Sequence, residues 1–164
     1  MICYASQSEK RQKWPLETLP AIFKAARHAT RNPHARAQLQ AWMQSHGVAT
    51  AEDLHNAARA GRYVATPEPR RHCDPIQPVA RTIAHGGDCD QWAAVLLAGL
   101  AVLGFDRLWL ISVGDEADPY RHVAVMLHAE DRYWRLDPKA DQQGVDFNQR
   151  ADNFNVQQYH RFTP

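Results

Sequence analysis

The sequence predicts an α+β domain, and three observations carry that prediction. Apolar residues recur with helical spacing through the first 60 residues. Residues 88–103 are apolar on nearly every side, as expected for a helix enclosed by the rest of a fold. Between residues 107 and 136 three short segments rich in Val, Leu, Ile, Trp and Tyr are typical of strands. Helices followed by consecutive strands are the order of an α+β domain.

Residues with known preferences at helix ends delimit the helices. Asn32-Pro33 interrupts the first helix, and Pro33 suits the first turn of the second. Gly47 ends the second helix, and Thr50 followed by Asp53 forms the pattern of a capping box that begins a third. The predicted helices cover residues 16–30, 33–46, 50–61, 79–84 and 88–103.

The strand pattern also predicts which side chains lie together. A tight turn at Glu130-Asp131 separates the last two strands, and a hairpin centred on it puts Ala124 opposite Asp137. His122 lies two residues before Ala124, on the same face of the sheet, and is therefore the diagonal neighbour of Asp137. A slip of one residue would place the two side chains on opposite faces. The predicted strands cover residues 107–113, 121–128 and 132–136.

The composition fits one globular domain. The chain has 164 residues, of which 45% are hydrophobic and 23% charged, and its net charge of +1 argues against a membrane or a nucleic acid as partner. Residues 1–82 carry 12 Lys/Arg against 6 Asp/Glu, whereas residues 83–164 carry 7 against 12. We expect the two halves to pack together and partly neutralise each other, with a nucleic-acid or acidic partner for the basic half as the alternative.

The cysteines and the apolar runs indicate a cytoplasmic protein. Cys3, Cys73 and Cys89 are too few and too widely spaced for a disulfide framework. No apolar leader segment follows Met1, so no secretory signal is expected. The longest apolar run, residues 92–105, has 14 residues and is too short to span a bilayer.

Cys89 is the first candidate for chemistry, because it lies where the apolar helix is expected to begin. The positive end of a helix dipole favours a thiolate there, and a thiolate is the reactive form of cysteine. Gly86-Gly87 would let a substrate carbonyl approach the sulfur closely. Asp88 and Asp90 flank the cysteine, and their negative charges oppose ionisation of the thiol unless a histidinium lies nearby.

His122 and Asp137 complete a possible catalytic triad. A carboxylate beside an imidazole holds the ring in one tautomer and stabilises its charged form. Each of the three residues alone has an ordinary structural explanation. Their order along the chain, at a helix start, in a strand and after the next strand, favours the joint, catalytic interpretation.

The motifs around these residues resemble the transglutaminase-like superfamily of cysteine enzymes. Gly86-Gly-Asp-Cys-Asp90 before the apolar helix, His122-Val-Ala-Val, and Tyr133-Trp-Arg-Leu-Asp-Pro138 look like its three catalytic segments. Asp74-Pro75-Ile-Gln-Pro78 resembles the approach to the cysteine in small phage- and prophage-borne members. The similarity covers roughly residues 60–140.

The resemblance implies a papain-like fold and a thioester mechanism without a cofactor. Cys89 would be the nucleophile, His122 the general base and acid, and Asp137 the orienting group. The substrate would be a protein or peptide amide, and the reaction proteolysis, deamidation or amine crosslinking. Candidates for the oxyanion hole or the cleft are Gln77, Asp88 and Trp134. A single domain, 1–164, would then comprise a helical part (1–60), a catalytic core (61–140) and a C-terminal extension (141–164).

Three other functions compete with this interpretation. A non-catalytic structural or accessory module of a phage, keeping the fold without turnover, is the main alternative. A nucleic-acid accessory protein rests only on the basic N-terminal half. A zinc site at His72, Cys73 and Asp74, with His85 and Cys89, lacks the paired spacing of structural zinc sites, so we expect no metal. The oligomeric state has no sequence signal.

Overall fold

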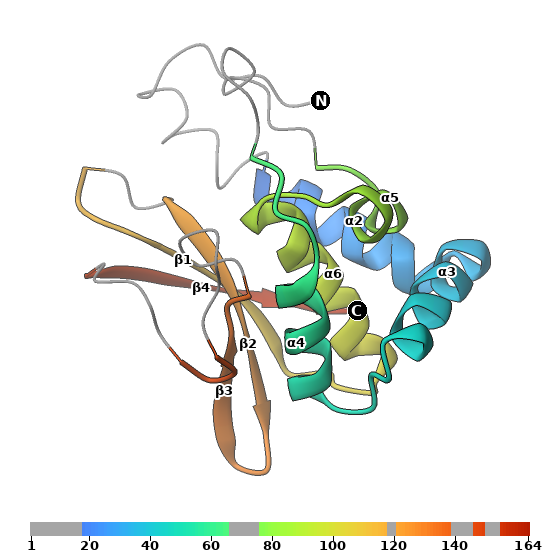
Figure 1. Cartoon of the computed structure of the whole chain (residues 1–164). Coiled ribbons are helices and arrows are strands. Elements are labelled where there is room, and N and C mark those ends of the chain that lie inside the picture. The colour runs from blue at the N-terminus through green and yellow to red at the C-terminus, as the bar shows by residue number, and fades with distance from the viewer. Residues whose placement is uncertain (1–17, 66–75, 118–120, 139–145, 150–154) are drawn as a thin grey trace.

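The computed structural model describes residues 18–65, 76–117, 121–138, 146–149 and 155–164. Within these ranges the chain forms five helices and one four-stranded antiparallel sheet, so the predicted α+β class is confirmed (Figure 1). The helices gather on one side of the sheet (Figure 1). No helix in the described part of the chain combines the length and the apolar character that crossing a bilayer requires.

The helices begin and end close to where their boundary residues predict. Asn32 caps α3 by accepting a hydrogen bond from the backbone N–H of Ala35 at 3.0 Å. Thr50 and Asp53 form the predicted capping box at the start of α4, each side chain accepting from the other's backbone N–H. The helices are α2 (Leu19–Arg31), α3 (Pro33–Ser45), α4 (Ala51–Ala60), α5 (Val79–His85) and α6 (Cys89–Val102).

Helix α6 is the centre of the fold. Every residue from Asp90 to Leu100 is buried, which explains why the helix is apolar on nearly all of its sides. It packs against α2, α4 and α5 and against β2 of the sheet (Figure 1). Because the helix is held from several directions, the position of its first turn is fixed relative to the sheet.

The sheet has the order β3-β2-β1-β4, with all neighbours antiparallel. Its first three strands form the predicted meander, whereas β4, in the predicted C-terminal extension, was not predicted as a strand. Phe162 of β4 is fully buried and lies 5.3 Å from the ring of Phe23 on α2. The strands are β1 (Leu108–Gly114), β2 (His122–Ala129), β3 (Arg132–Leu136) and β4 (Val156–Phe162).

The predicted hairpin register is also confirmed. Val125 lies opposite Leu136 and Ala129 opposite Arg132, so the next pair along would join Ala124 and Asp137. Glu130 and Asp131 form the turn, with φ angles of 54° and 57°. Two successive positive φ values are characteristic of the type I′ turn, whose twist matches that of the strands it joins. This turn therefore sets which residues of β3 face His122.

Candidate active site

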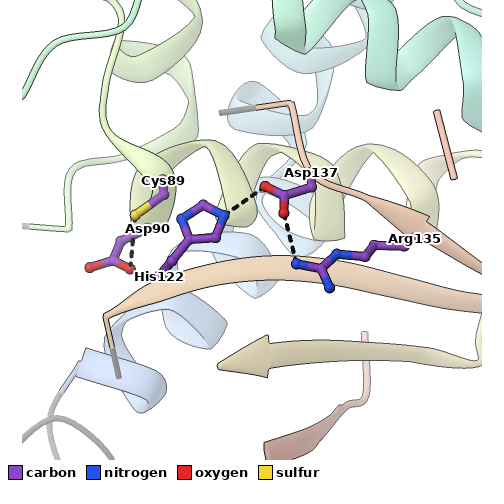
Figure 2. A network of polar contacts seen from close by, with 5 residues as sticks. All are labelled: Cys89, Asp90, His122, Arg135 and Asp137. Carbon is purple, nitrogen blue, oxygen red and sulfur yellow. Dashed lines mark hydrogen bonds and ion pairs between the residues drawn. The ribbon is translucent and has the colours of Figure 1, made fainter. Parts of the chain in front are cut away.

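Three elements bring Cys89, His122 and Asp137 together. Cys89 is the first residue of α6, His122 the first residue of β2, and Asp137 directly follows β3. Figure 2 shows the imidazole ring of His122 between the sulfur of Cys89 and the carboxylate of Asp137. A small cavity of about 10 Å³ has both Cys89 and Asp137 in its wall, together with Trp92, Ala93, Leu96, Val123, Ala124, Leu136 and Pro138.

The imidazole and the carboxylate form a short hydrogen bond. Nε2 of His122 lies 2.7 Å from Oδ1 of Asp137, and the two side chains are 14% and 1% exposed. When Nε2–H donates to the carboxylate, a neutral ring keeps its lone pair on Nδ1. That second nitrogen lies on the side of the ring where Cys89 is placed (Figure 2). The ring is therefore oriented to accept a proton from the direction of the sulfur.

Arg135 binds the other oxygen of the same carboxylate. Its Nη2 donates to Oδ2 of Asp137 at 2.8 Å (Figure 2). Burial raises the pKa of Asp137, but the hydrogen bond from His122 and the charges of His122 and Arg135 outweigh it and hold the pKa below its usual value. Asp137 is therefore a buried carboxylate stabilised in its ionised form. Sequence reasoning did not single out Arg135, although it lies on β3 two residues before Asp137, and alternation along an extended chain puts both side chains on the same face.

Two carboxylates surround the start of α6. Asp88 is the N-cap residue, and its Oδ1 accepts a hydrogen bond from the backbone N–H of Gln91 at 3.3 Å. Asp90 is buried, and its Oδ1 lies 3.9 Å from the sulfur of Cys89 (Figure 2). Asp88 thus stabilises the helix end that carries the cysteine, whereas Asp90 places a negative charge beside the thiol.

The two glycines before Cys89 are packed against the chain itself. Gly86 has a φ of 88°, and a Cβ on it would come within 2.4 Å of the carbonyl oxygen of Arg62. Gly87 donates to that same carbonyl at 3.1 Å and accepts from the N–H of Val64 at 3.0 Å. Residues 62–64 therefore make one of the close approaches that these glycines permit, and the approach of a substrate stays a prediction. These bonds fix the turn from which α6 begins.

Gln77 lies beside the same turn. Its Nε2 donates to the carbonyl of Gly86 at 2.8 Å and to Oε1 of Gln91 at 2.9 Å. An amide nitrogen has two hydrogens, so both are used in holding the turn and α6 together. An oxyanion role for Gln77, which stays a prediction, would require one of these bonds to break.

Two tryptophans lie near the site, and the cleft role expected for Trp134 stays a prediction. Trp134 stacks on Phe147, with ring centroids 5.5 Å apart and planes 16° apart, and it is not in the wall of the cavity beside Cys89. Trp92 is buried in the core and forms part of that wall. Its indole N–H donates to the carbonyl of Arg62 at 3.2 Å. Its place on α6, one turn after Cys89, is the signal that could have predicted this.

Metal ligands do not gather in the part of the chain that is described. No three His, Cys, Asp or Glu residues there are arranged to hold an ion. The motif His72-Cys73-Asp74 and the third cysteine, Cys3, lie outside the described residues.

Comparison of the chain with protein-family models, curated proteins and solved structures found no match. The resemblance to transglutaminase-like enzymes accordingly rests on the motifs around Cys89, His122 and Asp137.

Proposed function

We propose that this protein is a cysteine-dependent acyl-transfer enzyme that acts on amide bonds of proteins or peptides. The observation that carries the proposal is the His122 ring, held by Asp137 at 2.7 Å and lying between that carboxylate and the sulfur of Cys89 (Figure 2). A nucleophile, a base and a group that orients the base are the parts that covalent catalysis requires.

In the first step, Nδ1 of His122 takes the proton of the Cys89 thiol, and the thiolate attacks the carbonyl carbon of the amide. The imidazolium formed is stabilised by the buried carboxylate of Asp137. The carbonyl oxygen of the substrate becomes an oxyanion. Helix α6 begins at Cys89, and the helix dipole favours negative charge at that end.

In the second step, the tetrahedral intermediate collapses, the C–N bond breaks, and His122 returns the proton to the departing amine. The product is a thioester at Cys89. Water then attacks the thioester with His122 as base, releasing the acid and the free thiol. An amine in place of water would give a new amide. Hydrolysis and crosslinking thus differ only in the acceptor, and both are open to this site.

Chemical labelling tests the nucleophile without a known substrate. Iodoacetamide should alkylate Cys89 of the native protein at least about tenfold faster than Cys3 or Cys73, because a paired imidazole raises the fraction of reactive thiolate. The selectivity should be lost in His122→Ala. Rates for each cysteine are measured by mass spectrometry of the digested protein.

His128→Ala is the matched control, since His128 lies at the other end of the same strand and should leave the selectivity unchanged. Equal labelling of all three cysteines in the native protein would contradict the proposal. If Cys89 is selective, a library of peptides and glutamine-containing proteins, assayed for new amines and for released ammonia, separates peptidase from deamidase activity. Cys89→Ala must abolish any turnover found.

A second candidate function is a non-catalytic module, such as a phage accessory or morphogenesis protein, that keeps the fold without turnover. The observation that favours it is the buried carboxylate of Asp90 at 3.9 Å from the sulfur, which disfavours a thiolate. This alternative predicts slow alkylation of Cys89 that does not depend on His122. Hydrolysis of any library member that Cys89→Ala abolishes would exclude it.

A further inference from the structure

Arg135 is buried to a degree that is unusual for an arginine. Its side chain is 11% exposed, and the carboxylate that it binds is 1% exposed. Arginine is almost never deeply buried unless a partner of opposite charge accompanies it. Asp137 already has one oxygen bound to His122, so Arg135 supplies the cation for the other oxygen, Oδ2. The two donors approach different oxygens and together fix the plane of the carboxylate.

The backbone of Arg135 is fixed as well. β3 is at the edge of the sheet, and the outer side of Arg135 is bonded to Asn148. The N–H of Arg135 donates to Oδ1 of Asn148 at 3.1 Å, and the N–H of Asn148 donates to the carbonyl of Arg135 at 2.9 Å. These two bonds fix the backbone of Arg135, so its guanidinium reaches Asp137 from a backbone that is held in place.

We propose that Arg135 is a positioning residue of this site, which keeps the Asp137 carboxylate ionised and in one orientation for His122. The inference rests on the proposed function for its consequence in catalysis, but the ionic role itself is a property of the folded chain. A protonated Asp137 could not stabilise an imidazolium, and a rotated one would release the ring. Arg135 would therefore extend the active form of the site to lower pH.

The direction of the effect follows from the charges around Asp137. His122 faces it from β2, Arg135 from β3, Cys89 from α6 across the cavity, and His55 acts on it from α4. Arg135 is the member of this group that stays charged at every relevant pH. Removing a positive charge favours proton binding at each neighbouring group. Asp137 should therefore bind a proton at higher pH when Arg135 is neutralised.

Carboxyl ¹³C NMR of the full chain measures the pH at which Asp137 binds its proton. The Asp137 signal is assigned by its absence in Asp137→Asn, and its titration midpoint is compared among variants. Arg135→Gln should raise the midpoint by about one to three pH units, the usual effect of losing an opposite charge at this distance. Arg135→Lys, which keeps the charge, should move it less. Arg132→Gln is the matched control, because Arg132 is an exposed arginine on the same strand.

Arg135→Met, with an apolar side chain of similar length, is the second variant if Arg135→Gln does not fold. An unchanged Asp137 midpoint in either variant would overturn the inference.

The acid limb of the Cys89 alkylation rate, measured against pH, should shift in the same direction. If Cys89 proves unreactive in the native protein, the proposed function fails while the NMR shift still stands. If Cys89 is reactive and depends on His122 but the midpoint stays fixed, only the inference fails.

Discussion

At the scale of single residues, two electrostatic effects act in opposite directions on ionisation of the Cys89 thiol. The dipole of α6 favours a thiolate, whereas the carboxylate of Asp90, 3.9 Å from the sulfur, disfavours it. We expect Asp90→Asn to speed alkylation of Cys89 near neutral pH. Even in water, unit charges 4 Å apart interact by about 1 kcal/mol, so we expect a rate increase of at least about fivefold. The rate is measured with iodoacetamide at several pH values.

Asp106→Asn is the control for this prediction, because Asp106 is an exposed acid beyond the far end of α6. It changes the net charge by the same amount and should leave the rate unaltered. A slower reaction in Asp90→Asn would mean that Asp90 orients the thiol and that its hydrogen bond outweighs its charge.

Residue types and spacing were enough to predict the three central residues of the candidate site, but not the residues that hold them in place. Cys89, His122 and Asp137 carry chemistry that is recognisable in a sequence, and the hairpin register relates the last two. Arg135 has no such signal, because an arginine on a strand is usually solvated. Gln77 was a candidate by its type and its proximity to the motif, and its hydrogen bonds to Gly86 and Gln91 depend on packing between segments that no local pattern encodes.

At the scale of elements, the β2–β3 turn is built from residues that its geometry does not favour. Glu130 and Asp131 both have positive φ, a region that costs a residue with a Cβ about 1–2 kcal/mol. Asn-Gly is the preferred sequence of a type I′ turn. The double variant Glu130→Asn, Asp131→Gly should therefore raise the free energy of unfolding by about 1 kcal/mol. Urea denaturation followed by circular dichroism measures it.

The reverse sequence, Glu130→Gly with Asp131→Asn, is a useful control, because it relieves the same φ values with a different order of residues. Both variants keep residues that accept positive φ, so the turn and the register that brings His122 to Asp137 should be unchanged. Neither variant should therefore alter the alkylation selectivity of Cys89. A loss of stability in both would show that the native side chains contribute contacts that outweigh the backbone cost.

Helix ends were predicted well, because neighbouring residues in the sequence determine them. Strand β4 was not predicted, because it depends on pairing with a strand that is distant in the sequence. Asn32, Thr50 and Gly47 act on their immediate neighbours, and the predicted helix ends were close to the observed ones. β4 was missed because its inner face is largely polar, with Gln158 and His160 beside the apolar Phe162. His160 lies 3.3 Å from the hydroxyl of the buried Ser112 on β1, a partnership visible only once the strands are paired.

At the scale of the whole molecule, His55 should make stability depend on pH. Its ring is fully buried on α4, and Nε2 has no hydrogen-bond partner among the described residues. Burial lowers the pKa of His55, the charge of Arg59 acts in the same direction, and Asn56, Asp137 and Asp146 only partly oppose them. The unfolded chain therefore binds a proton more readily than the folded one. Stability is full above the ordinary histidine pKa of about 6.5 and is lost as pH falls through the lower, folded pKa.

Urea denaturation at intervals between pH 7.5 and pH 4.5 checks this expectation. His55→Gln should reduce the slope of unfolding free energy against pH, by up to about 1.4 kcal/mol per pH unit, the value for one proton. His34→Gln, at an exposed position on α3, is the control and should keep the native slope. An identical slope in all three proteins would show that His55 is not the group responsible.

The pairing of β4 with β1 also has a consequence for synthesis of the chain. β1 lies between β2 and β4, and every residue from Leu108 to Gly114 pairs with a residue between Val156 and Phe162. Until residues 156–162 have left the ribosome, β1 presents an unpaired row of amides and carbonyls on that side, beside an apolar surface. Exposed strand edges of this kind are templates for aggregation. A nascent or truncated chain that ends before β4 would thus be a natural client for chaperones.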